Sequence, residues 1–343
     1  MTNIPLVSII IPCYNSNTLL SAMIDCILRQ TFPDWELILV DDQSIDNTQE
    51  IIKEYISKDQ RIKMFVRDRQ PKGSTTCRNI GFENSCGKYV IHFDADDLIS
   101  DTCLEKRVAF MEANQEIDYA SFPAKSFTSS SQLPIYKHRE KTWGVKKYND
   151  LLTSFLKCDY SFSVWNNIYK KKSIESFRWD ENVKIYTDFS FIIPCILLGL
   201  RHQFSGLEEI DYFYHRFTNG QNMCSSFVTQ DKCDSTIYLF SETLDKLKQR
   251  SDYKRRRREF AHFIILHFER LIVGGDKKNI EEYLLFCKKY YNLLYIILTI
   301  INKLSIQVEN ILFRKLLLYF QTTIFFFRRQ SAVLFAMTLK HRR

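Results

Sequence analysis

The chain has 343 residues, of which 45% are hydrophobic and 26% charged, a composition that forms a folded core and excludes an intrinsically disordered protein. The length suits one large domain with an appendage, or two domains. The net charge of +8 is uneven, because the segment from Phe227 onward has 22 Lys and Arg against 11 Asp and Glu. That segment favours an anionic surface, and since no nucleic-acid-binding motif accompanies it, we expect no nucleic acid partner.

Short apolar runs alternate with helical segments through the first hundred residues. The runs lie at 6–12, 35–40, 62–65 and 89–93, and the first is short and rich in β-branched residues, which is typical of a strand covered on both faces. Helices are expected between them, from a cap at Ser16 or Asn17 to Gln30, from Asp46 to Tyr55, and over 74–84. This alternation predicts an α/β fold with a mostly parallel, doubly wound sheet and right-handed crossovers.

Beyond Asp97 the periodicity is weaker. We expect strands near 118–123 and 208–214, a Ser-rich loop at 126–132 and a helix over 149–157. From about Thr229 the pattern becomes almost wholly helical. The sequence therefore predicts a catalytic domain over 1–228 and a helical, basic region over 229–343.

The most informative segment is the predicted strand YVIHF, which runs directly into Asp94-Ala95-Asp96-Asp97. Three carboxylates within four residues repel one another unless a cation offsets their charge. Hard oxygen ligands suit Mg²⁺ or Mn²⁺, which typically also holds a substrate diphosphate. Ligands of open α/β sheets bind at the carboxyl ends of strands, so the cluster predicts a nucleotide-diphosphate site. The alternative interpretation is a solvated acidic turn.

The cysteines and the N-terminus favour a cytosolic protein. Ten cysteines form no C-x-x-C pair, and no basic segment precedes an apolar stretch at the start of the chain. We therefore expect reduced thiols and no secretory signal. The longest uncharged apolar-rich runs, 290–302 and 316–327, are shorter than the roughly 20 residues that a spanning helix needs.

The C-terminal segment nevertheless has the pattern of a membrane-surface helix. Over 311–329, the cations Arg314, Lys315, Arg328 and Arg329 share a narrow polar stripe on an otherwise Leu- and Phe-rich helix. A basic helix with a broad apolar face predicts peripheral attachment to anionic lipid. The alternative for this segment is a helix buried on the catalytic domain or in a dimer. A second cationic segment, the run Lys254–Arg258, has the alternative of a solvated helix face.

Four segments together resemble a family-2 glycosyltransferase of the GT-A fold. They occur in the family's order, over roughly the first 220 residues. They read VSIIIPCYN at Val7–Asn15, QTFPDWELILVDDQSIDNT at Gln30–Thr48, CRNIGFENSCGKYVIHFDADD at Cys77–Asp97, and FRWDENVKIYTDFSFI at Phe177–Ile192. The resemblance implies transfer of a sugar from a nucleotide-sugar, usually a UDP-sugar, to a glycan or lipid-linked glycan acceptor at the cytosolic face of the cell membrane. Such enzymes build surface polysaccharides.

The resemblance also implies a role for each matching residue. For the nucleotide-sugar, it implies residues that line a nucleoside pocket, residues that contact the uracil and the ribose, and cations that hold the diphosphate. Asp96, with Asp94, matches the ligands of Mn²⁺ or Mg²⁺, Asp97 matches their supporting partner, and Asp188 matches the catalytic base. The implied nucleotide-sugar contacts are Pro12, Tyr14, Asn15, Asp42, Lys72, Arg78, Asp94 and Arg216.

Each of these roles has a simpler alternative, and the motifs depart from the family in two places. Asp42 could be an ordinary turn residue, and Arg78 could be a solvated charge on a helix. Tyr14 could serve only to pack against its neighbours, and Asp188 could cap a helix. Relatives often carry Glu-Asp where this chain has Thr187-Asp188, so the orientation of the base by a neighbouring Glu is in doubt. Relatives also often have Lys at the position of Asn167, which puts one acceptor or phosphate contact in doubt.

Two other functions compete with glycosyl transfer. A sugar nucleotidyltransferase has a similar fold, but it usually begins with a Gly-rich phosphate loop, and the segment Pro12–Asn15 has no glycine. A catalytically decayed membrane-bound scaffold is the second, and the presence of all four carboxylates Asp42, Asp94, Asp96 and Asp188 argues against it. The sequence leaves open the sugar, the acceptor, the linkage and the oligomeric state.

Overall fold

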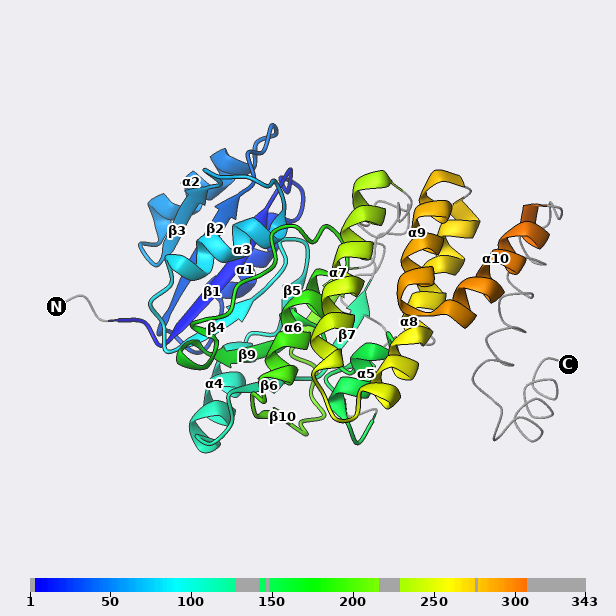
Figure 1. Ribbon diagram of the computed structural model, residues 1–343. Coiled ribbons are helices and arrows are strands. Elements are labelled where there is room, and N and C mark those ends of the chain that lie inside the picture. The colour runs from blue at the N-terminus through cyan, green and yellow to red at the C-terminus, as the bar shows by residue number, and fades with distance from the viewer. Residues whose placement is uncertain (1–3, 128–141, 146–147, 216–228, 275–276, 307–343) are drawn as a thin grey trace, which may run out of the picture. The chain divides into compact units, whose positions relative to one another are not determined.

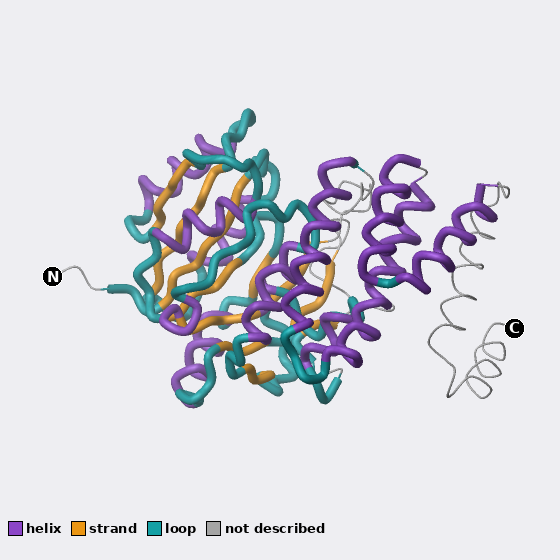
Figure 2. Tube along the Cα trace, viewed as in Figure 1, coloured by secondary structure: helices purple, strands orange, loops and turns teal. Residues whose placement is uncertain are grey.

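The computed structural model describes residues 4–127, 142–145, 148–215, 229–274 and 277–306. The chain divides into two compact units (Figures 1 and 2). The first comprises Met1–Phe155 with Asp159–Ser225, and the second comprises Leu156–Cys158 with Ser226–Arg343. Each unit has its own core and is described by itself.

The first unit is built on a seven-stranded sheet. Its strands are β1 (Val7–Cys13), β2 (Trp35–Asp41), β3 (Ile62–Val66), β4 (Tyr89–His92), β6 (Tyr119–Ser121), β9 (Asn167–Lys170) and β10 (His202–Phe204). They lie in the order β10-β6-β9-β4-β1-β2-β3. All neighbouring strands are parallel except that β9 runs antiparallel to both β4 and β6. The prediction of a mostly parallel α/β sheet is confirmed.

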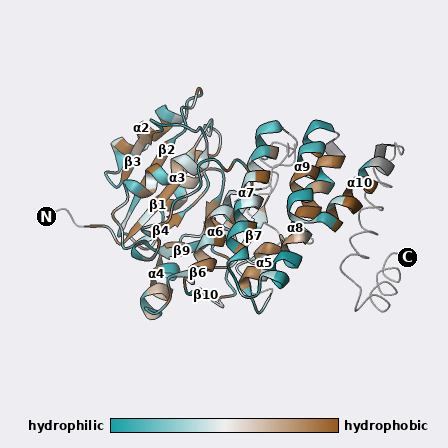
Figure 3. Ribbon diagram, in the orientation of Figure 1, coloured by the Kyte–Doolittle hydropathy of each residue, from teal (hydrophilic) through white to brown (hydrophobic). Residues whose placement is uncertain are grey.

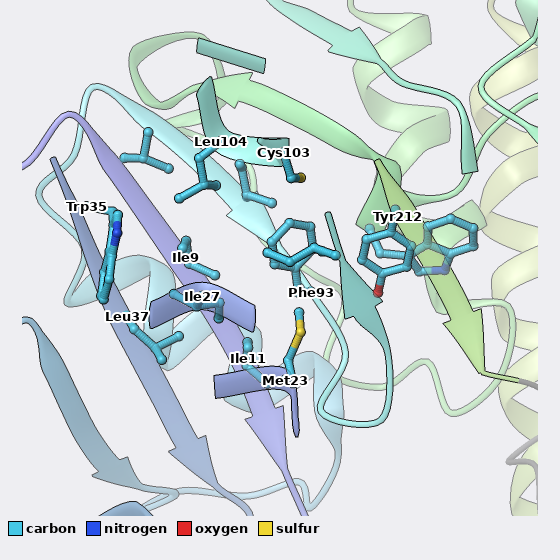
Figure 4. Close-up of a cluster of buried hydrophobic side chains, with 14 of the residues drawn as sticks. Ile9, Ile11, Met23, Ile27, Trp35, Leu37, Phe93, Cys103, Leu104 and Tyr212 are labelled. Carbon is cyan, nitrogen blue, oxygen red and sulfur yellow. The ribbon is translucent and has the colours of Figure 1, made fainter. Parts of the chain in front are cut away.

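Helices cover both faces of this sheet. The helices of the first unit are α1 (Leu20–Leu28), α2 (Thr48–Lys58), α3 (Ser74–Glu83), α4 (Cys103–Ala113), α5 (Leu151–Leu156) and α6 (Thr187–Leu197), with short 3-10 helices η1 (Val164–Asn166) and η2 (Lys171–Ile174). Figure 4 shows one face, where Ile9 and Ile11 of β1 meet Met23 and Ile27 of α1. The central strands are buried on both sides, which explains their continuous apolar runs, visible in brown in Figure 3.

The helix α3 packs unusually close to the opposite face. A Cβ on Gly81 would lie 2.4 Å from Cγ2 of Ile10, so only glycine lets the helix approach β1 this closely. The close packing places the first turns of α3, including Arg78, next to the end of β4.

A second, four-stranded sheet extends the first unit on the side of the acidic cluster. It contains β5 (Leu98–Ile99), β7 (Ala124–Phe127), β8 (Thr142–Trp143) and β11 (Tyr212–His215), in the order β5-β11-β7-β8. Since β5 directly follows Asp97, this sheet holds β11 beside the acidic cluster.

A buried ion pair anchors β11 to α4. Nε and Nη2 of Arg107 donate to the carboxylate of Asp211 at 2.7 and 2.9 Å, and Nη1 donates to the carbonyl oxygens of Trp165 and Asn167. Arg107 is fully buried and Asp211 is 2% exposed, so the two charges depend on each other for solvation. One guanidinium therefore joins α4, β11 and the segment around η1.

Several local expectations were less accurate than the overall pattern. The weak strand and helix signals near 118–123, 149–157 and 208–214 correspond to β6, α5 and β11. The antiparallel β9, the second sheet and α4 were missed. Ser16 and Asn17 are not caps, because α1 begins at Leu20, and the hydroxyl of Ser16 instead bonds to the backbone of Tyr14.

The second unit is a group of helices. These are α7 (Gln230–Lys248), α8 (Tyr253–Gly274), α9 (Lys277–Tyr290) and α10 (Asn292–Ile306). Its core is aromatic, with Phe240 packed against Phe260, Phe263 and Tyr283. Helical structure from about Thr229 was predicted. The stripe over 311–329 and the Ser-rich loop beyond Phe127 lie outside the described residues.

The cationic run at the start of α8 is only partly a solvated face. Lys254, Arg255 and Arg258 are exposed, but Arg256 is 4% exposed and pairs with Asp252 and Glu259. Arg257 donates to the carbonyl oxygen of Tyr290. Two cations of this run therefore stabilise the second unit.

The Arg107–Asp211 pair gives a prediction about stability. Asp211→Ala leaves a buried guanidinium without its counter-ion, so we expect a loss of about 3–5 kcal/mol in the free energy of unfolding, measured by urea denaturation. The control is Asp101→Ala, which removes an exposed pair with Arg29 and should cost less than about 1 kcal/mol. Equal losses in the two variants would contradict this role.

Candidate active site

The carboxyl ends of four parallel strands meet at one edge of the main sheet. Tyr14 and Asn15 follow β1, Asp42 follows β2, Arg67 follows β3, and Asp94 lies just beyond β4. In open α/β sheets this edge is where ligands bind. The sheet topology thus brings together residues that are far apart in the sequence.

Asp42 forms a buried ion pair with Arg67. Nε of Arg67 donates to Oδ1 of Asp42, and its Nη1 donates to the carbonyl oxygen of Arg69 at 2.6 Å. Asp42 is 5% exposed and Arg67 is 3% exposed. Asp42 is therefore more than an ordinary turn residue, because its carboxylate is fixed in one orientation by a cation.

Tyr14, Asn15 and Lys72 form the exposed border of this edge. Nζ of Lys72 lies 3.5 Å from the ring centroid of Tyr14, within cation–π range. The backbone of Asn15 adopts a positive φ of 48°, and its Oδ1 accepts the backbone N–H of Ile45 at 3.0 Å. Tyr14 is 46% exposed, so its ring has one face on Lys72 and much of its surface open to solvent. Pro12 lies half-buried one residue before the end of β1, paired with Val40.

Arg78 is a buried cation in α3, and it forms an ion pair with Asp94. Its guanidinium carbon lies 4.8 Å from the ring centroid of Trp179. Its Nε is buried and has no hydrogen-bond partner among the described residues. Arg78 is therefore not a solvated helix charge, and it retains a donor beyond its bond to Asp94.

Asp97 supports the structure around the cluster. Its carboxylate accepts the hydroxyl of Tyr212 and, at 2.6 Å, the backbone N–H of His215. Burial, with the charges of Asp96 and Asp94, raises the pKa of Asp97 well above its usual range. Both bonds fix β11 to the acidic loop. The position of Arg216, the next residue, lies outside the described residues.

Asp96 is the carboxylate of the cluster that is bonded to neither Arg78 nor Tyr212. Burial, followed by the negative charge of Asp94, raises the pKa of Asp96 to about 6. No group of three or more His, Cys, Asp or Glu side chains arranged to hold a metal ion occurs within the described ranges. Any ion bound by Asp96 would therefore need oxygen ligands from a substrate or water.

Asp188 lies in the first turn of α6, at the same site. Its Oδ2 accepts a hydrogen bond from the hydroxyl of Ser163, and the nearby backbone N–H of Val164 acts to lower its pKa. Burial raises the pKa of Asp188 to about 6; the positive charge of Arg78 opposes this shift, and the charge of Asp94 adds to it. The N-cap position of α6 is occupied by Tyr186 and has no side-chain cap hydrogen bond, so Asp188 is not the cap of this helix.

The packing around Arg78 explains how Asp188 is brought to the acidic loop. The side-chain amide of Asn79 donates to the carbonyl oxygen of Trp179 at 2.9 Å, and its Oδ1 accepts the backbone N–H of Trp179 at 2.8 Å. His92 packs edge-on against Trp179 and Phe191, and burial keeps its pKa well below the usual range, so it is neutral. The segment before α6 is thereby docked on α3 and β4.

Sequence reasoning missed three residues of this site. Arg67 could have been found, because it follows a predicted strand at the same sheet edge as Asp42. Tyr212 and Ser163 had no such signal. Their roles depend on β11 and on the loop before η1, whose positions no local pattern in the sequence specifies.

The comparisons with known sequences point to one family. The family model described as glycosyl transferase family 2 matches residues 8–187. An uncharacterized glycosyltransferase of Haemophilus influenzae is 33% identical over 239 residues, which are 70% of this chain and 88% of that protein. An Escherichia coli protein named as a UDP-Glc:alpha-D-GlcNAc-diphosphoundecaprenol beta-1,3-glucosyltransferase is 37% identical over 187 residues, covering 50% of this chain and 72% of its own length.

Similar solved structures have the same fold. The crystal structure of S. aureus TarS 1-349 in complex with UDP-GlcNAc has a TM-score of 0.64 at 17% identity, covering 87% of each chain. The mannosyltransferase PcManGT of Pyrobaculum calidifontis, in complex with GDP-Man and Mn²⁺, has a TM-score of 0.54 at 15% identity, covering 93% of this chain and 85% of its own. At these identities the likeness is one of fold.

Proposed function

This chain belongs to glycosyltransferase family 2, and we propose that it transfers a sugar from a UDP-sugar to a glycan or lipid-linked glycan hydroxyl with inversion at the anomeric carbon. The observation that carries the proposal is the position of Arg78. It is paired with Asp94, and its charge also acts on Asp188. A candidate base and a candidate diphosphate site thus lie around one buried cation.

The choice of uridine as the nucleoside rests on Asp42. Arg67 occupies Oδ1 of this carboxylate and leaves Oδ2 as an acceptor for the N3–H of uracil, a donor that cytosine lacks at that position. Tyr14 offers an exposed ring beside Lys72 for the nucleoside and the first phosphate. TarS was crystallised with UDP-GlcNAc, and the E. coli relative is named for UDP-Glc, which supports a UDP-linked donor.

The transfer needs a base at the acceptor and positive charge at the leaving group. Asp188 accepts the proton of the acceptor hydroxyl as that oxygen bonds to the anomeric carbon and the bond to the diphosphate breaks, releasing UDP. Attack opposite the diphosphate inverts the anomeric centre. Arg78, once it exchanges Asp94 for the diphosphate or reaches it through Nε, stabilises the negative charge that develops there.

The residues present fit a divalent cation at Asp96. Its pKa is raised partly by the charge of Asp94, and a cation beside both would remove that repulsion. We propose that Asp96, with Asp94, holds Mn²⁺ or Mg²⁺, and that the donor diphosphate supplies further oxygens. When bound, the ion supplies Lewis-acid stabilisation of the leaving diphosphate.

The metal proposal predicts the behaviour of Asp96→Asn. This variant keeps the shape of the side chain but removes its charge, so UDP release from a UDP-sugar and acceptor should fall by roughly 10²-fold or more. Asp101→Asn, an exposed acid outside the site, is the matched control and should retain activity. Full activity of the unmodified protein in excess EDTA would show that the metal role is wrong.

The role of Asp188 predicts both a variant and a pH profile. Asp188→Asn should lower kcat by roughly 10²–10⁴-fold while UDP affinity, measured by calorimetry, changes little. Because the base must be ionised and its pKa is about 6, kcat of the unmodified protein should be maximal above that pH and fall as the pH drops through it. Loss of UDP binding in Asp188→Asn would assign the residue to donor binding instead.

We also propose that the protein works on the inner face of the cell membrane. The E. coli relative is named for an acceptor on diphosphoundecaprenol, a lipid, and an enzyme with such an acceptor benefits from a surface position. None of the helices in the described residues is long and apolar enough to span a bilayer. In the second unit, α10 exposes Leu293, Ile296 and Ile300, which recur at helical spacing along one face.

Liposome flotation tests the membrane proposal. The protein should float with anionic but not neutral vesicles, in a salt-sensitive manner. Changing Arg314, Lys315, Arg328 and Arg329 together to Gln should greatly weaken binding, since each cation contributes roughly 1 kcal/mol at an anionic surface. The charge-matched control changes four exposed lysines of the first unit, Lys53, Lys58, Lys88 and Lys172. If the unmodified protein ignores anionic vesicles, the attachment is disproved.

A further inference from the structure

The carboxylate of Asp188 is held by the loop that precedes η1. The hydroxyl of Ser163 donates to its Oδ2, and the adjacent backbone N–H of Val164 acts to lower the pKa of the same carboxylate. A carboxylate offers about four lone-pair positions, so the bond from Ser163 constrains one oxygen and still leaves acceptor positions for a substrate proton. Bonds to an ionised group are also stronger than bonds between neutral groups.

Ser163 is itself fixed in place. It precedes η1 and forms a capping box with Asn166, whose Oδ1 accepts the backbone N–H of Ser163 at 2.8 Å. Asn166 in turn donates through Nδ2 to the carbonyl oxygen of Phe122 at 2.6 Å and accepts the N–H of Phe122 at 2.9 Å. Ser163 is 6% exposed. The hydroxyl is therefore presented to Asp188 from a loop bonded to the segment after β6.

The residue directly before Asp188 supplies no charge that could orient the carboxylate. This residue is Thr187, and the backbone enters α6 through Tyr186 at a positive φ of 58° without a side-chain cap. The charged and titratable groups that act on Asp188 from other elements are Arg78 of α3, Asp94 after β4 and Tyr169 of β9. Ser163, in the loop before η1, provides a hydrogen bond to this carboxylate.

We propose that Ser163 is a positioning residue for the base of the transfer reaction, holding the carboxylate of Asp188 ionised and correctly oriented toward the acceptor hydroxyl. The proposal rests on the function proposed above for Asp188. In this proposal the base is oriented by a residue of a loop distant in sequence. The position next to Asp188 is Thr187, which is not acidic and so cannot orient the base by its charge. The effect of Ser163 should therefore appear in turnover and not in donor binding.

The experiment measures kcat, KM for the donor and the pH profile of Ser163→Ala. Removing a donor to an ionised carboxylate disfavours the charged form, so the acidic limb of the kcat profile should move up by about one pH unit. At neutral pH kcat should fall about 10-fold, while KM for the UDP-sugar and affinity for UDP stay within about 2-fold. Ser163→Thr, which keeps the hydroxyl, should restore most of kcat and the original pH limb.

The matched control is Ser154→Ala in α5. Ser154 is also a buried serine of this region, bonded to the carbonyl oxygen of Asp159 at 2.8 Å and to Ser161. Its substitution should lower the melting temperature without moving the acidic limb. An unmoved limb in Ser163→Ala, or an equal movement in Ser154→Ala, would overturn the proposal. Asp188→Asn is assayed in parallel, because activity in that variant would disprove the base itself and not only its positioning.

Discussion

The central constraint on this structure is the concentration of three carboxylates, one of them fully buried, within four residues after β4. Two of them are compensated, each in a different way: Asp94 by Arg78, and Asp97 by Tyr212 and the N–H of His215. Asp96 keeps a raised pKa and has neither of these partners. The compensating groups come from two elements: Arg78 from α3, and Tyr212 and the N–H of His215 from β11, a strand of the second sheet. The carboxylate of Asp96 is the observation that supports the proposal of a cation and a diphosphate at this loop.

The position of Asp188 also depends on α3. Its carboxylate reaches the site because the segment around Trp179 is bonded to Asn79 on α3, the helix that also carries Arg78. One helix therefore positions the cation, the acidic loop and the candidate base. The close approach of α3 to β1, permitted by Gly81, is thus a condition for the site as well as for the core.

The sequence was sufficient for the parallel strands and their carboxyl-end residues, because apolar runs and strand ends are local patterns. Asp42, Asp94 and Asp96 could be singled out in this way, and the family resemblance added Asp188. The antiparallel β9 and the small sheet were missed, since they are short strands whose pairing is decided by distant partners. Ser163 and Tyr212 act through contacts across 25 and 115 residues of sequence, which no periodicity encodes.

The central claim is that one carboxylate, Asp188, activates the acceptor for direct displacement of UDP. The measurement that tests it most directly is the anomeric configuration of the product formed from a UDP-α-sugar, read from the coupling constant of the new anomeric proton by NMR. The account predicts a β-linked product, formed in one displacement with loss of UDP. An α-linked product would contradict it, because retention requires a second displacement or a different face of attack.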